Sequence, residues 1–183
     1  MLKTPTSLLF IYFFSAIANT HGGYQSPTFA KYVKEITSRF KKEMKKEHQL
    51  ISEGGGGGFL KDVEEVAVFF IAYRPASIED ARELGIIATE RLLAQINSNE
   101  KVRPFLRECP FTSKGTNIMI SFYEKRNTYQ TNESISNIII NNNKLSYYKY
   151  DRETEKLIKI FSEPYEDGRK LAMIGRSEKA QHD

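Results

Sequence analysis

The sequence predicts an α+β fold: a central helix packed on a mostly antiparallel sheet of four or five strands, preceded by an amphipathic helix on a glycine hinge. Three observations carry this prediction. The apolar run from Val66 to Tyr73 has the length and composition of a buried strand. A capped helical pattern follows, from Ser77 to about Asn97. From Asn117 onward, short apolar runs alternate with turn residues, which indicates an antiparallel meander.

Residues 1–18 have the features of a secretory signal peptide. Lys3 supplies a positive charge, Leu8 to Phe14 form an apolar run, and Ala16-Ile17-Ala18 offers the small residues of a cleavage site. The run is much shorter than the about 20 apolar residues that a membrane-spanning helix needs. We therefore expect cleavage after Ala18 and a secreted or periplasmic protein. The single cysteine, Cys109, excludes an intramolecular disulfide, which favours a bacterial exported protein.

Residues 19–53 are predicted to form a lead-in and a basic amphipathic helix. Ser26-Pro27 has the pattern of a helix start, and apolar residues then recur at helical spacing to about Leu50. These residues are Phe29, Val33, Ile36, Phe40 and Met44. Between Lys31 and Glu47, seven basic residues stand against three acidic ones. Two interpretations remain open: the solvated face of a docked helix, or contact of residues 31–47 with an anionic membrane surface.

The five glycines from Gly54 to Gly58 predict a flexible linker. A phosphate-binding loop would need Gly-Lys-Ser/Thr at its end, whereas Phe59-Leu60-Lys61 follows here. The basic helix is therefore expected to be tethered loosely to an α+β domain of residues 59–174. Residues 175–183 are expected to form a disordered tail.

The central helix has a start signal with a clear mechanism. The Ser77 hydroxyl can cap the first turn, Asp80 can reach back to the cap amide, and Pro75 stops any earlier helix. One face collects apolar and small residues, namely Ala81, Leu84, Gly85, Ala88, Leu92 and Ile96. Because glycine weakens a helix, Gly85 suggests a close approach of this helix to the sheet.

Two arginines in the segment after this helix are candidate binding residues. Arg103 and Arg107 are four residues apart and would share a face if the segment makes a helical turn. They could hold an anion, or they could pair with local carboxylates such as Glu100 and Glu108. The ion pairs are favoured, because such pairs are common on protein surfaces.

The C-terminal half is predicted to contain an antiparallel meander and a short final helix. The expected strands are 117–123, 134–140, 145–150 and 156–161, with turns at 141–143 and 151–153. Alternation places Tyr147 on the face of Leu145 and places Tyr148 and Tyr150 on the other. These two tyrosines are candidates for an exposed aromatic binding surface, or they are half-buried strand residues. The final helix is expected from Pro164 to about Ile174.

Part of the chain resembles a known group of proteins. The pattern comprises Glu79-x-Ala81-Arg82-x-Leu84, Ile96-Asn97-x-Asn99, Val102-Arg103-Pro104-Phe105-Leu106 and Pro110-Phe111, behind a signal peptide and a glycine run. It resembles small exported proteins of unassigned function from intracellular bacteria, over about a third of the chain. The resemblance implies an exported bacterial origin.

Catalysis and metal binding receive no positive signal from the sequence. The histidines His21, His48 and His182 lack a second ligand at a metal-binding spacing, so no metal or other cofactor is expected. Glu83 and Glu90 would lie about 10.5 Å apart along a helix, which is too far for the carboxylate pair of a typical glycosidase. We therefore assign no catalytic residue.

The leading functional hypothesis is a non-enzymatic binding or interaction protein with a protein partner. It would use the sheet face around Tyr148 and Tyr150 or the basic helix. The alternative is a small-ligand or lipid binder with a cavity between helix and sheet. A small hydrolase, with Arg74, Glu83, Glu90 or Arg103 in a cleft, is less favoured. Nucleic acid is disfavoured as a partner, because its binders usually concentrate more basic charge beside exposed aromatic residues.

Overall fold

The structure is a computed structural model that describes residues 27–125, 128–129 and 134–179 of the chain. The predicted signal peptide and the lead-in to residue 26 lie outside these residues. In chain order the elements are α1 (Thr28–His48), β1 (Ile51–Gly58), β2 (Glu65–Ala72), α2 (Ile78–Asn97), η1 (Arg103–Phe105), η2 (Ser113–Gly115), β3 (Thr116–Lys125), β4 (Thr128–Tyr129), β5 (Asn137–Asn141), β6 (Lys144–Asp151), β7 (Lys156–Pro164) and α3 (Tyr165–Lys179).

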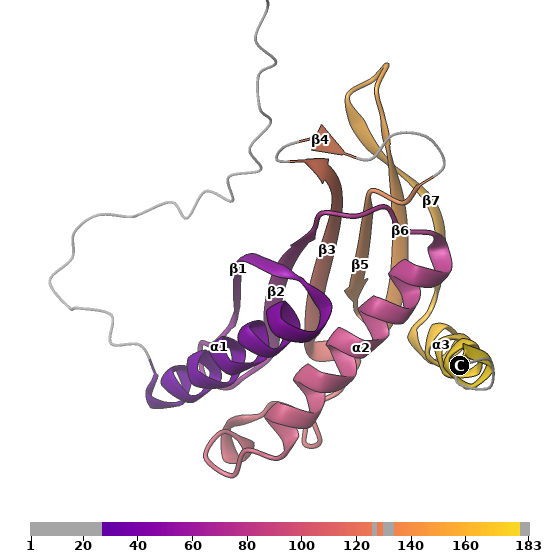
Figure 1. The fold of residues 1–183 in the computed structure, drawn as a ribbon. Helices are drawn as coiled ribbons and strands as arrows, with labels where there is room; N and C mark the ends of the chain where they lie inside the picture. Colours follow the sequence, from indigo (N-terminus) through magenta and orange to yellow (C-terminus); the bar gives the residue numbers. More distant parts are fainter. Residues whose placement is uncertain (1–26, 126–127, 130–133, 180–183) are drawn as a thin grey trace, which may run out of the picture.

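The α+β class and the mostly antiparallel sheet are confirmed (Figure 1). Six strands form an open sheet in the order β1-β2-β3-β5-β6-β7, and β4 pairs with β3 off this path. Only β2 and β3 pair in parallel among these strands, and α2 connects them, as a parallel pair requires a crossover. The predicted meander forms β3, β5, β6 and β7, which pair antiparallel in that order. The strands β1 and β4 were not predicted.

Helix α2 begins and ends where the sequence predicts. The Ser77 amide donates to Asp80 Oδ2 at 3.2 Å, and the Asp80 amide donates to Ser77 Oγ at 3.1 Å. A Cβ added at Gly85 would lie 2.8 Å from Ile140 Cδ1 and 3.1 Å from Ile138 Cδ1. The predicted close approach of the helix to the sheet is therefore confirmed.

Helix α1 is docked on the sheet through its predicted apolar stripe. All five stripe residues are buried, and the Phe40 ring meets the Phe70 ring edge-on at 5.7 Å between centroids. The basic side of the helix is solvated, which was the first of the two interpretations offered above. A docked helix can still contact an anionic membrane surface, because its outer, basic side remains exposed.

The predicted glycine linker is wrong. Gly54 to Gly58 belong to β1, which pairs antiparallel with β2. Because glycine has no side chain to pack, this segment is held by its backbone pairing with β2. At two of the glycines a side chain would clash with neighbouring atoms. A Cβ at Gly55 would lie 2.4 Å from the Ala67 carbonyl oxygen, and one at Gly57 would lie 2.3 Å from the Phe59 ring. The composition of a glycine run indicates flexibility. It does not reveal that another strand pairs with the run and orders it.

The C-terminal end differs from the prediction in one respect. Helix α3 begins at Tyr165, close to the predicted start, but it continues to Lys179. Residues 175–179 are therefore helical rather than part of a tail, and residues 180–183 lie outside the described chain. The predicted asparagine turn is confirmed, with positive φ at Asn142 and Asn143.

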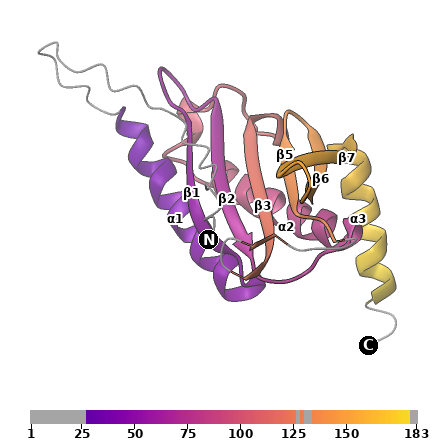
Figure 2. The same cartoon turned by 90° about the horizontal axis from the view of Figure 1, so that it is seen from above.

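All three described helices pack against the same face of the sheet (Figures 1 and 2). Helix α1 contacts Phe70, and α2 contacts Ile138 and Ile140. For α3, a Cβ added at Gly168 would lie 3.0 Å from Leu145 Cδ2. Leu145 is the cross-strand partner of Ile140, so it lies on that face too. No described helix covers the opposite face, which we call the open face.

Candidate binding surfaces

An apolar row crosses the open face. Phe69, Met119, Ile139 and Ser146 are partners in successive strand pairs from β2 to β6, and Gly54 adjoins Phe69 on β1. Neighbouring residues on a strand point to opposite faces, so this row points away from the helices. The three large side chains are half-buried. They form a continuous apolar strip over β2, β3 and β5.

A second row lies beside the first and contains Ile71, Ser121, Asn137 and Tyr148. The first three of these residues are buried, and Tyr148 is half-buried. Neither row has a charged side chain between β2 and β6. A sheet face that only meets water usually carries polar and charged residues. The centres of protein interfaces are depleted in charge and enriched in aromatic residues and methionine. The open face therefore has the composition of an interface.

Asn137 has an unused acceptor in this second row. Its side chain is 1% exposed, and its Nδ2 donates to Ser121 Oγ at 2.7 Å. No hydrogen-bond partner of its Oδ1 lies within the described chain. An unpaired buried acceptor costs free energy, and this oxygen is enclosed, so it is not accessible to a partner.

The predicted tyrosine faces agree with the structure. Tyr147 is buried beside Leu145, as predicted, and Tyr148 and Tyr150 alternate onto the open face. Both are half-buried, which was the alternative given for them. Tyr148 therefore extends the second row as a partly accessible ring, and the Tyr150 amide donates to Ser136 Oγ at 2.8 Å.

One further aromatic pair was not predicted. Tyr73 is 46% exposed, and its ring centroid lies 6.5 Å from that of Tyr123. Each tyrosine ended a predicted strand, but only the parallel pairing of β2 with β3 brings the two together. This pairing could not be read from either strand alone.

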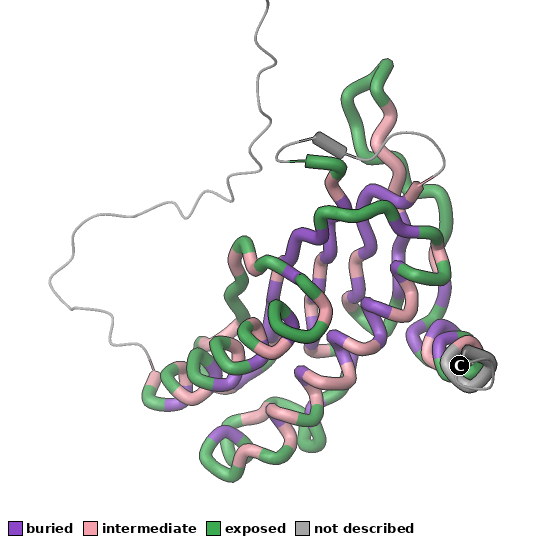
Figure 3. The backbone as a smooth tube through the Cα atoms, viewed as in Figure 1, coloured by how far each residue is buried: buried purple, intermediate pink, exposed green. Residues whose placement is uncertain are grey.

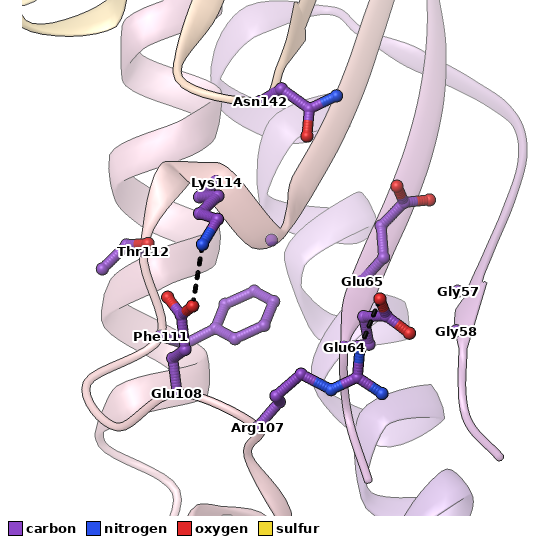
Figure 4. A pocket seen from close by; sticks show the side chains of 11 residues that line it. Gly57, Gly58, Glu64, Glu65, Arg107, Glu108, Phe111, Thr112, Lys114 and Asn142 are labelled. Atoms are coloured by element: carbon purple, nitrogen blue, oxygen red, sulfur yellow. Dashed lines mark hydrogen bonds and ion pairs between the residues drawn. The ribbon is translucent and has the colours of Figure 1, made fainter. Parts of the chain in front are cut away.

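The two arginine candidates are separate. Arg107 lines a groove of about 550 Å³ at the edge of the sheet where β2 and β3 begin (Figure 4). It pairs with Asp62 at 3.0 Å and with Glu64, rather than with Glu100 or Glu108. The backbone explains this choice, because the Arg107 amide donates to the Val63 carbonyl at 3.1 Å. Arg103 is exposed in η1 and is not among the groove residues.

The groove is unsuited to the anion that two arginines would attract. Its second cation, Lys114, pairs with Glu108 at 3.0 Å. Glu64 and Glu65 line the groove as well, so each cation faces carboxylates. Arg107 therefore makes ion pairs, but with Asp62 and Glu64 rather than with the carboxylates named in the prediction.

A buried charged cluster joins α2, β6 and β7. Arg82 Nε lies 2.8 Å from Glu163 Oε1, with side chains only 11% and 7% exposed. The Tyr147 hydroxyl donates to the same oxygen. Burial, reinforced by this hydrogen bond, raises the pKa of Tyr147 well above its usual range. The cluster is enclosed by its own partners and fixes the position of β7.

A second polar cluster attaches α3 to α2. The Tyr165 hydroxyl donates to Glu90 Oε1 at 2.7 Å, and Arg169 Nε approaches the same oxygen at 3.0 Å. Burial raises the pKa of Tyr165 well above its usual range, and the hydrogen bond to Glu90 adds to this effect. Glu90, one of the residues considered for a hydrolase, thus has a role in holding α3.

The described residues contain no group of three or more histidines, cysteines, aspartates or glutamates placed to hold a metal ion. No described helix has both the length and the apolar character needed to cross a membrane. Cys109 is exposed. A comparison of the chain with family models, curated proteins and solved structures found no match. The candidate surfaces therefore depend on geometry and chemistry alone.

Proposed function

We propose that this chain is an exported, non-enzymatic binding protein whose open face receives a partner protein. The observation that carries the proposal is the one-sided packing of the helices, which leaves the half-buried apolar strip of Phe69, Met119 and Ile139 on a sheet face that no described helix covers. Export depends on the signal-peptide pattern of residues 1–18.

The chemistry of the face favours a partner segment that presents apolar side chains. Phe69, Met119 and Ile139 are half-buried and would contact such side chains directly. A charged segment would lose its hydration here without gaining a counter-charge.

The glycines of β1 support close approach of a partner at one side of this face. A Cβ at Gly56 would meet nothing within 4 Å, so packing inside the described chain does not require glycine there. Gly56 pairs with Ala67 and so lies on the open face. Glycine within a strand often marks a place where another backbone approaches.

The small-ligand alternative has weaker support. It needs an apolar cavity between helix and sheet, yet α2 contacts the sheet tightly at Gly85. The groove at the sheet edge is lined by charged residues, including Glu64, Glu65 and Arg107, rather than by apolar ones. The open face is therefore the better candidate for the functional surface.

A photo-crosslinking residue at position 139 tests the proposal in the cells that produce the protein. We expect one defined protein to be attached at 139 and none at 171, where Leu171 is 48% exposed on α3 and serves as the control. The isolated partner should bind the purified chain, and Met119→Lys should weaken that binding at least about tenfold, as at an interface hot spot. Unfolding midpoints of both chains verify that the variant folds.

Three results would contradict the proposal. These are no adduct at 139, an adduct within the same chain to residues 1–26, and an isolated partner that binds the Met119→Lys chain as well as the original. A crosslink between two copies of this chain would show that the open face mediates self-association and does not bind a different protein.

A further inference from the structure

Helix α1 turns two of its three acidic residues toward α2. Gln95 Nε2 lies 2.5 Å from Glu43 Oε2, and Arg91 pairs with Glu47 at 2.5 Å. Arg39, the one arginine of the helix, is drawn to the same side, where its Nε donates to Gln95 Oε1 at 3.1 Å. The contact between the helices thus withdraws acidic groups from the outer side of α1.

The outer side of α1 is left as a lysine stripe, composed of Lys31, Lys34, Lys41, Lys42, Lys45 and Lys46. At about 100° per residue these positions fall within an arc of about 140°, opposite the buried apolar stripe, and Glu35 is the one acidic residue within that arc. Five of the lysines are exposed and Lys41 is half-buried. None of them makes an ion pair within the described chain. Figure 3 shows the exposed outer side of α1 and its buried inner side.

We infer that the lysine stripe adsorbs the protein to a membrane surface rich in anionic phospholipid headgroups. A helix of 21 residues is about 30 Å long, so the stripe is a straight array of cations that can meet a flat surface along its whole length. Clusters of four to eight basic residues bind anionic bilayers, with about 1 kcal/mol for each lysine near the surface. The inference is independent of the open face.

This adsorption needs no insertion of the helix. An interfacial amphipathic helix buries its apolar side in the lipid, but the apolar side of α1 is already occupied by the core, with Phe40 and Met44 fully buried. The attraction is therefore electrostatic and should disappear when salt screens it.

Nucleic acid fits the stripe less well. Phosphate recognition in nucleic acids favours arginine, whose fork binds two oxygens at once, yet Arg39 is turned toward α2. Exposed aromatic residues for stacking on bases are also expected. Tyr32, beside the stripe, is half-buried, with Lys31 4.9 Å and Lys101 5.7 Å from its ring centre.

Vesicle sedimentation with the full chain tests the inference. Vesicles of phosphatidylcholine with about one third phosphatidylglycerol should bind the protein at about 0.05 M salt and release it at about 0.5 M, where the screening length is about 4 Å. Pure phosphatidylcholine vesicles should not show this salt-sensitive binding. The triple variant Lys34→Gln, Lys41→Gln, Lys45→Gln should bind about a hundredfold more weakly, which is about fivefold for each lysine.

A matched variant separates the stripe from net charge. Lys144→Gln, Lys156→Gln, Lys159→Gln removes three exposed lysines from β6 and β7 and should change vesicle binding less than about threefold, since these side chains lie outside the stripe. Equal loss in the two triple variants would refute the inference. So would binding that persists at high salt and is unchanged by the stripe variant, since an apolar segment would then be the anchor. Tighter, stripe-dependent binding to a mixed-sequence DNA or RNA duplex would assign the stripe to nucleic acid instead.

Discussion

At the scale of single residues, Glu163 has the most consequential contacts in the described chain. It is the last but one residue of β7, and one of its oxygens receives both Arg82 from α2 and the Tyr147 hydroxyl from β6. A buried ion pair is strongly destabilised when one partner is lost, because the other charge then stays buried without compensation. The cluster therefore specifies where β7 ends and α3 begins.

Replacing Glu163 by glutamine tests this role. Glu163→Gln preserves the shape of the side chain but leaves Arg82 charged and nearly buried, so we expect the free energy of unfolding to fall by about 3 kcal/mol or more. Urea denaturation followed by circular dichroism measures the change. As a control, Glu108→Gln breaks the exposed pair with Lys114 and should cost less than about 1 kcal/mol. Similar small effects of both variants would mean that the buried pair contributes nothing to stability.

At the scale of elements, β1 is unusual because successive glycines in it have different structural reasons. Gly55 has φ of +153°, and a Cβ there would overlap the backbone of Ala67. Gly56 has an open space where its Cβ would lie. The same substitution at these two neighbours should therefore have opposite effects.

We expect Gly55→Ala to destabilise the protein by at least about 2 kcal/mol, because it forces both strain and a backbone clash. Gly56→Ala should leave stability unchanged or raise it by up to about 1 kcal/mol, because alanine restricts the unfolded chain. Thermal or urea unfolding of the two variants decides the matter. If the glycine run were a free linker, both variants would match the original chain.

The elements show which interactions can be inferred from the sequence. Helices α1 and α2 were predictable because their signals are local: the apolar spacing from Phe29 to Met44, and the cap formed by Ser77 with Asp80. Strand β1 was not, because its glycines carry no pattern and its stability comes from pairing with β2.

The candidate surfaces show the same limit. Alternation within β6 correctly assigned Tyr148 to the face opposite Tyr147. The apolar row of Phe69, Met119 and Ile139, however, depends on the register of three strands. Register is a tertiary property, and a shift by one residue would turn each strand's side chains to the other face.

At the scale of the whole molecule, the two proposed surfaces lie on opposite sides. Helix α1 belongs to the helical layer, and its lysine stripe points away from the sheet, whereas Phe69 and its row point away from the helices. A molecule adsorbed to a bilayer through α1 would therefore present its open face away from the lipid. The two proposals are compatible in a single bound state, and each has its own test.

The whole fold should also lose stability steeply at alkaline pH. Burial raises the pKa of Tyr147 and of Tyr165 far above the usual value, and hydrogen bonds to Glu163 and Glu90 reinforce the shift. In the unfolded chain both tyrosines lose their protons above about pH 10, while in the folded chain they retain them. The unfolded state then binds fewer protons, so the stabilising contribution is complete below about pH 10 and decreases above it.

With two such tyrosines, the free energy of unfolding should fall by up to about 2.7 kcal/mol per pH unit above pH 10. Tyr147→Phe removes one of the two titrating groups and should reduce that slope by about half, whatever it does to stability at neutral pH. Urea midpoints between pH 8 and pH 11.5 measure both slopes. If the urea midpoints of Tyr147→Phe and of the original chain fell with pH at the same rate, Tyr147 would lose its proton in the folded protein as readily as in the unfolded chain. The buried cluster around Glu163 would then contain an ionised tyrosine at high pH.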